Sequence, residues 1–379
     1  MDVFHAAASV FRLAIPLRCG YNFHIIDKKE GSPVKRDSNL DLIRSVAIVT
    51  VLAVHFFLNS GFYDVPSAGL VLAAILRTQL MVCVPLFLLL TGYLNGKKTW
   101  SPGYLRSLGK LLLTYALACI FCCVFRAAVL GGPWSPIQWI RGMLNYSAAP
   151  YAWYVEMYIG LFLLIPFLNA AWNALPGKRS RRALTLVLLF LAVAPTLNDI
   201  FLHFGWQIIP SQWTAVYPVA YYFTGRWLRE YPPRLRWWHL LVIDVLSAVV
   251  GGLVHLYKAQ GGPIAYLSLN YWNGVFPYIC AVSLFSLLRL WDTERLPAPV
   301  RHGFYRLARL SLPVFLLSWI GDQLVYGWLR GPEPSGYLGT GWLVPAVILV
   351  LIISVILAEI LMLIQRGILS LPVGRKKAE

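Results

Sequence analysis

The sequence predicts an all-α membrane protein with about ten transmembrane helices and with both termini in the cytoplasm. Of its 379 residues, 58% are hydrophobic and only 13% are charged, whereas soluble globular domains carry roughly 25% charged residues. Apolar runs of about 20 residues, long enough to cross a hydrocarbon core of about 30 Å, recur along the chain. Short clusters of Lys and Arg follow every second run, which is typical of the cytoplasmic connections of membrane proteins.

The polar breaks between the apolar runs define the predicted helices. They span residues 40–59, 70–94, 107–130, 152–173, 183–201, 212–229, 238–257, 272–291, 305–329 and 341–366. We therefore expect one membrane domain over residues 37–368. A cytoplasmic or interfacial segment, 1–36, precedes it, and a basic cytoplasmic tail, 369–379, follows it.

The positive charge is distributed between the helices rather than over one face. The chain holds 33 Lys and Arg against 16 Asp and Glu, a formal net charge of +17. Because the cations form short clusters in alternate connections, they indicate membrane orientation and not a nucleic-acid-binding surface. The opposite connections contain little beyond Arg141, Lys258 and Arg330.

The opposite connections, which we expect outside the cytoplasm, are rich in aromatic residues, Gly and Pro. Their tryptophans are expected at the outer membrane interface, where most would act as anchors. A minority could instead line a sugar-binding rim, because sugars stack on aromatic faces. The residues concerned are Trp134, Trp139, Trp206, Trp213 and Trp272.

The six cysteines predict neither a disulfide framework nor a metal site. All but Cys19 lie within apolar runs, and no paired spacing occurs in an external connection. Cys119, Cys122 and Cys123 have no His or carboxylate nearby in sequence, so we expect them to pack as small apolar side chains.

Three ionisable side chains interrupt the first apolar run, RDSNLDLIRSVAIVTVLAVHF. Arg44 and His55 are eleven residues apart, which is about 1100° of helical rotation, within about 20° of three full turns. Asp41 falls near the same face. An Arg44 at the cytoplasmic interface would place His55 about 16 Å deeper, near the middle of the membrane. For Asp41 and Arg44 the alternative is a snorkelling interfacial pair.

His55 is the strongest candidate for chemistry. Ionisable groups within a membrane span are costly and mark functional sites by default, and a neutral imidazole with an ordinary pKa near 6.5 accepts a hydroxyl proton at neutral pH. Glu156 could pair with a cation or orient an imidazole. His255 is expected at the interface. For the other polar groups, structural pairing and function remain equally open: Arg77, Gln79, Asp322, Gln323 and Glu359.

Four segments together resemble the integral-membrane acyltransferase-3 family, especially its surface-polysaccharide O-acetyltransferases. LDLIRSVAIVTVLAVHF carries the family's Arg-x10-His pair as Arg44 and His55. VPLFLLLTGYL, AWYVEMYIGLFLLIPFLN and SLPVFLLSW are similar to three further family segments. Two departures stand out. Ser318 occupies the position where many relatives have His, and the family's Arg-rich segment is reduced to Lys97, Lys98, Arg106 and Lys110.

The resemblance implies transfer of an acyl group, commonly acetyl, from acyl-CoA to a glycan hydroxyl. It implies His55 as general base or, as the second option, as a covalent relay. Lys97, Lys98, Arg106 and Lys110 would bind the phosphates of coenzyme A, and Trp153 and Tyr154 the acceptor, a cell-surface or lipid-linked glycan. Arg44 would polarise the thioester, contact coenzyme A or hold Asp41. The location implied is a bacterial cytoplasmic membrane, and no metal is expected.

A proton-coupled transporter or flippase for a glycan or lipid-linked sugar is the alternative. In that case Arg44, His55 and Glu156 would form a proton relay. Against it, no repeat relates the two halves of the sequence, and the Arg–His pair lies in one helix rather than between two repeats.

Overall fold

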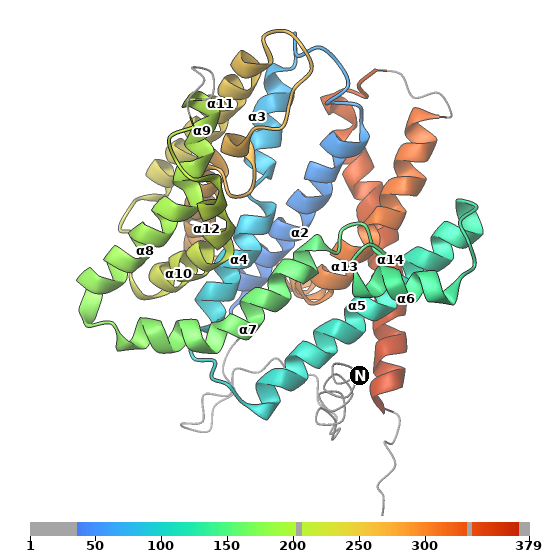
Figure 1. Cartoon of the computed structure of the whole chain (residues 1–379), viewed down its shortest axis with the longest axis horizontal. Helices are drawn as coiled ribbons and strands as arrows, with labels where there is room; N and C mark the ends of the chain where they lie inside the picture. Colours follow the sequence, from blue (N-terminus) through green and yellow to red (C-terminus); the bar gives the residue numbers. More distant parts are fainter. Residues whose placement is uncertain (1–35, 202–206, 332–335, 371–379) are drawn as a thin grey trace, which may run out of the picture.

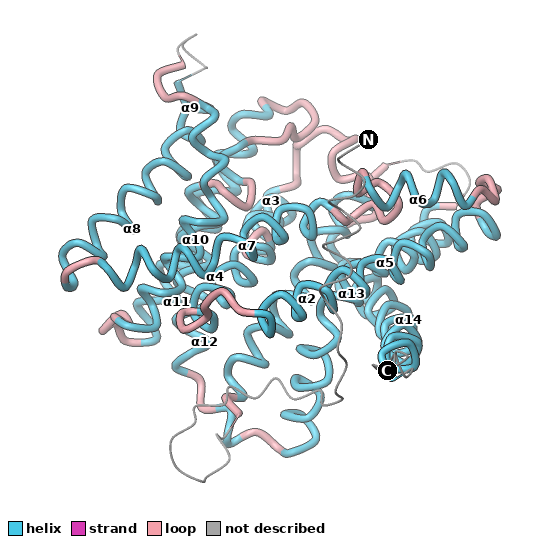
Figure 2. Tube along the Cα trace, turned by 60° about the horizontal axis from the view of Figure 1, so that its bottom comes forward, coloured by secondary structure: helices cyan, strands magenta, loops and turns pink. Residues whose placement is uncertain are grey.

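The computed structural model describes residues 36–201, 207–331 and 336–370, and within them it is an all-α bundle (Figures 1 and 2). All ten predicted runs are helical. The predicted N-terminal segment, apart from Arg36, and the basic tail beyond Ser370 lie outside the described residues. The helices are α2 (Ser38–Asn59), α3 (Val71–Leu80), α4 (Cys83–Asn95), α5 (Pro102–Val129), α6 (Pro136–Leu144), α7 (Trp153–Ala174), α8 (Gly177–Val193), α9 (Asn198–Phe201), α10 (Tyr217–Glu230), α11 (Trp237–Ala259), α12 (Val275–Leu290), α13 (Ala298–Arg330) and α14 (Leu343–Ser370).

Among the described residues, eight helical segments are long and apolar enough to cross a membrane, with α3 and α4 counting together as one. The predicted spans 212–229 and 305–329 are the two that fall short. The first is the 14-residue α10, and the second is the 33-residue α13, which carries Asp322 and Gln323 in its apolar half. Both still pack inside the bundle, α10 against α4 and α13 against α2 and α14.

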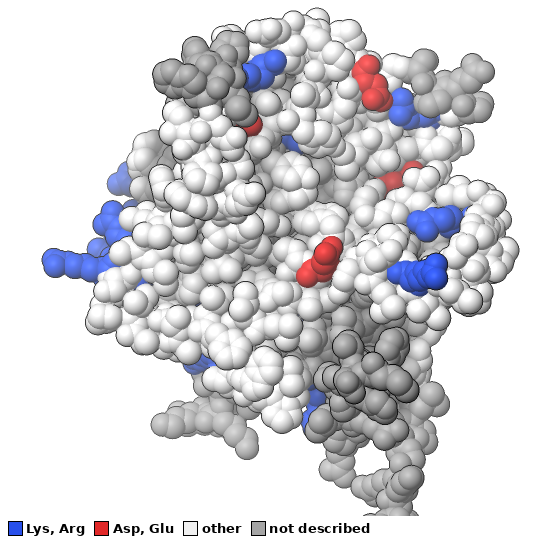
Figure 3. All heavy atoms as spheres, in the orientation of Figure 1, with Lys and Arg blue, Asp and Glu red and all other residues white. Residues whose placement is uncertain are grey.

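The outer surface of the bundle suits a lipid environment. Across the face in Figure 3, charged side chains are few and lie between wide uncharged areas. Large apolar side chains such as Phe167, Leu246 and Ile352 are more than half exposed. Exposed apolar surface of this extent indicates contact with lipid rather than water, so the protein is a multi-pass membrane protein.

The second predicted span is broken rather than continuous. Helix α3 ends at Leu80 and α4 begins at Cys83. Pro85 has no backbone N–H to donate to the carbonyl of Met81, so the helical hydrogen-bond ladder is interrupted at this point. The break turns the chain between its contacts with α11 and with α10.

The basic connections meet at one end of the bundle, where α5 begins and α14 ends (the lower end in Figure 1). Hydrogen bonds join helix ends there that are far apart in sequence. Asn39 donates to the carbonyl of Arg289 over 3.2 Å, Asn169 to that of Lys98 over 2.8 Å, and Arg306 to the Glu359 carboxylate over 2.7 Å. The positive-inside rule predicts that this end, which we call the basic end, faces the cytoplasm.

A buried arginine ties four helices together at the basic end. Arg226 of α10 donates to the carbonyl of Gly96 and to the Asn169 side chain of α7. It also bonds Glu230, one turn further along α10, and this carboxylate accepts from Trp172 and from Arg181 of α8. Since a buried charge is tolerated only when it is paired and hydrogen-bonded, this network fixes α4, α7, α8 and α10 relative to one another.

Helix α2 lies at the centre, in contact with α4, α12, α13 and α14. Its apolar side chains Ile43, Ile48, Phe56 and Phe57 are fully buried. All five cysteines that the structure describes are also buried and free, as the sequence predicted. The first predicted span is therefore an inner helix, whose polar side chains face protein and not lipid.

Helices α4 and α10 approach each other closely at two glycines, which gives a first prediction. A Cβ on Gly92 would overlap the carbonyl oxygen of Tyr222, and one on Gly225 would overlap that of Leu89. Gly92→Ala should force the helices apart and destabilise the protein by about 1–3 kcal/mol, measured as a lower melting temperature in detergent. Gly160→Ala, where no atom lies within 4 Å, is the control. Equal stability of the two variants would contradict the close approach.

Candidate active site

The centre of the site is His55, in the last turns of α2. Its side chain is only 9% exposed. The Tyr151 ring packs on the imidazole with ring centroids 3.9 Å apart, and Phe315 of α13 lies 6.4 Å away by the same measure. The imidazole is therefore enclosed on two sides by aromatic rings from different parts of the chain.

A carboxylate from α13 faces the imidazole. Oδ2 of Asp322 lies 3.3 Å from Nδ1 of His55, and Asp322 is completely buried. The Tyr151 hydroxyl donates a hydrogen bond of 2.7 Å to the same Oδ2. Neither His55 Nδ1 nor Asp322 Oδ1 has a well-aligned hydrogen bond. The three side chains form a buried polar cluster with unused hydrogen-bonding capacity.

The sequence of α13 explains how Asp322 reaches this position. Phe315, Ser318 and Asp322 follow one another at helical spacings of three and four residues, which puts them on one face. The Ser318 hydroxyl bonds the carbonyl of Phe315 and is fully buried. Thus the position where many relatives have His faces the core, and Asp322 lies one turn further along the same face.

Tyr151 belongs to the connection before α7, which the sequence predicted on the outer side of the membrane. Ala148, Ala149 and Ala152 are fully buried, and such small side chains allow the backbone to enter between helices. The backbone N–H of Ala148 donates to the carbonyl of Gly142, and that of Ala152 to the carbonyl of Ala149. Irregular backbone is tolerated at membrane depth only when protein surrounds it and satisfies its polar groups.

Arg44 lies on the α7 side of α2, as His55 does. The Arg44 guanidinium interacts electrostatically with Asp41 and with the hydroxyls of Tyr154 and Tyr158 on α7. The Tyr154 and Tyr158 rings stack at 5.9 Å, and Tyr154 packs on Phe315 at 5.5 Å. The rings of Tyr154, Tyr158 and Phe315 therefore lie between Arg44 and His55 along α2.

Asp41 is held by a different arginine from the one expected. Arg36 donates two hydrogen bonds to its carboxylate, at 2.6 and 2.7 Å. Bidentate pairing of this kind is the strongest geometry for a guanidinium and a carboxylate. Arg36 therefore holds Asp41 directly, whereas Arg44 interacts with it electrostatically and makes no hydrogen bond to any residue within 36–201, 207–331 or 336–370.

Glu156 does not orient the imidazole. It is exposed in the first turn of α7, and the carboxylate beside His55 is Asp322. Sequence reasoning placed Asp322 among several undecided polar residues and missed Tyr151 entirely. The signal for Asp322 was its helical spacing from SLPVFLLSW. Tyr151 had no comparable signal, because its position depends on how the connection folds.

Most of the other polar residues within predicted spans have structural partners. His255 was expected at the interface, but it is buried and its Nε2 bonds the carbonyl of Ala265. The remaining pairs are Arg77 with the Tyr63 hydroxyl, Gln79 with Asp244, and Glu359 with Arg306. These contacts join helices and connections, and none of them involves the His55 cluster.

The four cations expected to bind coenzyme A lie together at the basic end. Lys97 and Lys98 are exposed on the α4–α5 connection, and Arg106 and Lys110 are exposed in the first turns of α5. The Tyr104 hydroxyl bonds the carbonyl of Phe162 and so fixes this part of α5 against α7. A separate hollow of about 430 Å³ opens at this end between the start of α2 and the end of α12, with lining residues that include Arg36, Asp37, Asn39, Arg289 and Trp291.

Trp153 and Tyr154, expected to contact the acceptor, lie in the first turn of α7, close to the His55 cluster. Trp153 stacks on Trp272 with centroids 4.4 Å apart and the ring planes 13° apart. Tyr154 packs on Phe315, which in turn lies beside His55. The two residues therefore join the buried cluster to the connection before α12.

The protein is thus an all-α membrane protein with a buried site in which an imidazole faces a carboxylate. The model of the acyltransferase-3 family, described as an acyltransferase domain, matches residues 37–359. The chain belongs to this family, and it is a membrane acyltransferase. No curated protein sequence and no solved structure gives a significant match.

The packing of Tyr151 on His55 predicts the chemical accessibility of the imidazole. Tyr151→Ala removes the ring at 3.9 Å, so it should raise the rate at which diethylpyrocarbonate modifies His55 severalfold. Peptide mass spectrometry of the purified protein would measure this rate. Modification of His255, which is buried against Ala265, should not change. An unchanged rate at His55 would show that Tyr151 does not shield the imidazole.

Proposed function

We propose that the protein transfers an acyl group, most simply acetyl, from acyl-CoA to a hydroxyl group of a cell-surface or lipid-linked glycan, with His55 as general base. The observation that carries the proposal is the 3.3 Å contact between His55 Nδ1 and the fully buried Asp322 carboxylate. Family membership supports acyl transfer, and the proposal adds the donor, the acceptor and the residue roles.

The contact with Asp322 supports Nε2 as the imidazole nitrogen that acts. With a proton on Nδ1 facing the carboxylate, Nε2 is the basic nitrogen of the neutral ring. Nε2 removes the proton of the acceptor hydroxyl while the oxygen attacks the thioester carbonyl carbon. The C–S bond then breaks, an ester forms, and the imidazolium returns its proton to the coenzyme A thiolate. These steps transfer the hydroxyl proton to the coenzyme A thiol by way of His55, and no further reactant is needed.

Asp322 and Tyr151 act as positioning residues in this proposal. The carboxylate stabilises the imidazolium that forms during the reaction and favours the tautomer with a proton on Nδ1, which is the role of the acid in Ser–His–Asp triads. The Tyr151 hydrogen bond of 2.7 Å orients the carboxylate. The present Nδ1–Oδ2 contact is poorly aligned, and catalytic hydrogen bonds often tighten only when substrate is bound.

The donor is proposed to approach from the basic end. Coenzyme A carries several phosphate charges, and Lys97, Lys98, Arg106 and Lys110 are exposed there. Guanidinium and ammonium groups bind phosphates well. Arg44, on the same side of α2 as His55 but about three turns nearer the basic end, is proposed to contact the coenzyme A part of the donor. By the positive-inside rule the basic end faces the cytoplasm, so the proposed donor comes from the cytoplasm and the proposed location is the cytoplasmic membrane of a bacterium.

The direct test is transfer of label from radioactive acetyl-CoA to the glycan fraction of the cell envelope by purified protein. His55→Ala should lower the rate by about 10²- to 10⁴-fold, the usual contribution of a general base. Asp322→Asn keeps the size of the side chain but removes the charge that stabilises the imidazolium, so kcat should fall strongly while KM for acetyl-CoA changes little.

The matched control is Ser283→Ala on α12, which removes a polar contact with Asp244 of α11 and should retain transfer. Correct insertion of each variant is checked by gel filtration in detergent. Full activity of His55→Ala would contradict the proposed role of the imidazole as general base. If the unchanged protein transfers no label from acetyl-CoA, the proposed donor is wrong.

The cations at the start of α5 give a separate prediction for donor binding. Lys98→Gln combined with Arg106→Gln should raise KM for acetyl-CoA about threefold, since each exposed ion pair contributes about 0.2–1 kcal/mol, and should leave kcat nearly unchanged. The control is Arg179→Gln with Arg182→Gln, which removes two exposed cations from the start of α8. An equal rise in KM in both pairs would indicate a general field effect rather than a binding site.

A further inference from the structure

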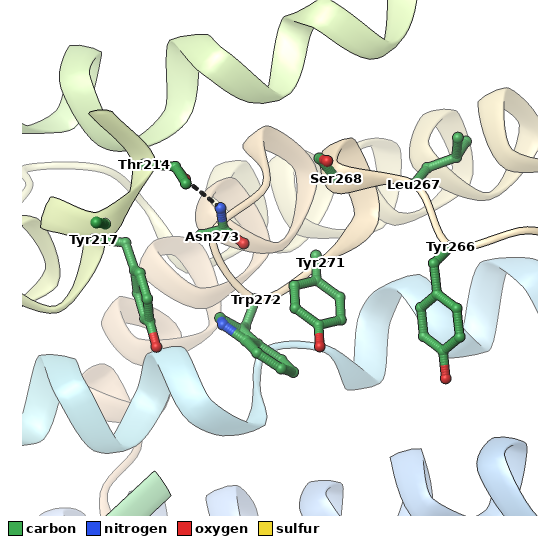
Figure 4. Close-up of a pocket in the computed structure, with 9 residues that line it drawn as sticks. Thr214, Tyr217, Tyr266, Leu267, Ser268, Tyr271, Trp272 and Asn273 are labelled. Atoms are coloured by element: carbon green, nitrogen blue, oxygen red, sulfur yellow. Dashed lines mark hydrogen bonds between the residues drawn. The ribbon is translucent and has the colours of Figure 1, made fainter. Parts of the chain in front are cut away.

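The end of the bundle opposite the basic end holds a cavity of about 560 Å³ with an aromatic wall (Figure 4). Four aromatic rings lie side by side along this wall, one from Tyr217 of α10 and three from the connection before α12. These three are Tyr266, Tyr271 and Trp272, with ring centroids 6.2 Å apart for the first pair and 3.5 Å for the second. The other lining residues are Thr214, Ala215, Leu267, Ser268 and Asn273.

The backbone behind this wall is fixed by buried hydrogen bonds. The fully buried Arg77 of α3 donates to the carbonyl of Asn270 over 2.5 Å, and the Asn270 side chain donates to the carbonyl of Gly251 on α11. The Tyr221 hydroxyl donates to the carbonyl of Trp272. Because the supporting groups are buried and paired, the rings are held in place before any ligand arrives, which lowers the entropy lost on binding.

Polar groups lie between the rings. The amide of Asn273 donates to the hydroxyl of Thr214 (Figure 4), and the Ser268 hydroxyl also lines the cavity. Burial raises the pKa of Tyr266 to about 12, so its phenol keeps its proton at neutral pH and remains a hydrogen-bond donor. None of the nine lining residues is charged.

The aromatic wall is continuous with the His55 cluster. Trp272 stacks on Trp153 at 4.4 Å, and Trp153 meets Tyr154 at 6.1 Å. Tyr154 packs on Phe315 at 5.5 Å, and Phe315 lies 6.4 Å from His55. Four successive ring contacts therefore link Trp272 with the imidazole, and the cavity lies on the side away from the exposed Lys and Arg of the basic end.

We propose that this cavity is a subsite for an uncharged sugar residue of the acceptor, on the outer side of the residue that is acylated. The inference rests on the proposed function and assigns the residues that hold the acceptor. The C–H faces of a pyranose pack on aromatic rings, while its hydroxyls bond Asn273, Ser268 and the tyrosine phenols. The absence of charge from the lining favours a neutral glycan over a phosphorylated or acidic one.

Binding of neutral oligosaccharides to the full-length protein tests the subsite without requiring chemistry. Saturation-transfer difference NMR is recorded on the His55→Ala protein with maltotetraose, cellotetraose and chitotetraose as probes. Adding Trp272→Ala should weaken the transfer to the sugar ring protons about threefold or more, by loss of the stacking surface, whereas Trp272→Phe should retain most of it.

Trp328→Ala is the matched control. Trp328 is an exposed tryptophan in the last turn of α13 that does not line the cavity. If Trp272→Ala fails to fold, Tyr266→Ala replaces it, since that ring is 57% exposed. The proposal is overturned if no probe binds or if Trp328→Ala weakens binding equally. It is also overturned if dihexanoyl-phosphatidylglycerol gives a saturation-transfer signal and the sugars do not.

The outcomes for the subsite and for the catalytic role are distinguishable. Sugar binding that depends on Trp272, in a protein that never transfers label from acetyl-CoA, supports the subsite and rejects the reaction. Transfer that depends on His55 but is indifferent to Trp272, with an unchanged KM for the acceptor, supports the reaction and rejects the subsite.

Discussion

The contact between Asp322 and His55 is the constraint on which the rest of the site depends. A fully buried carboxylate is stable only with partners nearby, and the structure supplies them from two separate parts of the chain, α2 and the connection before α7. Bringing these partners together requires that α2 lie in the centre of the bundle, that α13 pack along it, and that the 145–152 segment enter between them. The arrangement of α2, α13 and the 145–152 segment therefore provides the buried Asp322 with its partners.

The two ends of the bundle have different chemistry. Exposed cations, supported by the buried Arg226 network, gather at one end. The other end has aromatic rings and uncharged polar groups around a cavity supported by the buried Arg77. In the proposed reaction, the anionic donor and the neutral acceptor would approach His55 from these opposite ends, and neither would have to displace the other.

The sequence was sufficient to predict the helices and the importance of α2, because hydrophobic runs and charge clusters are local signals. It also placed Arg44 and His55 on one side of α2 by periodicity alone. It did not identify Tyr151 or choose Asp322 over Glu156, since these depend on how an irregular connection and a distant helix pack. Likewise, nothing local distinguished Arg36 from Arg44 as the partner of Asp41.

The entry of residues 145–152 into the bundle has a consequence for how such enzymes diversify. Tyr151 belongs to an irregular connection, and such segments tolerate substitution and changes of length better than packed helices do. A relative could therefore reshape the wall around its imidazole by altering the residues beside Tyr151, while Tyr151 kept its hydrogen bond to the carboxylate on α13. The shape of the space beside the imidazole would then evolve in the connection, independently of the contact between α2 and α13.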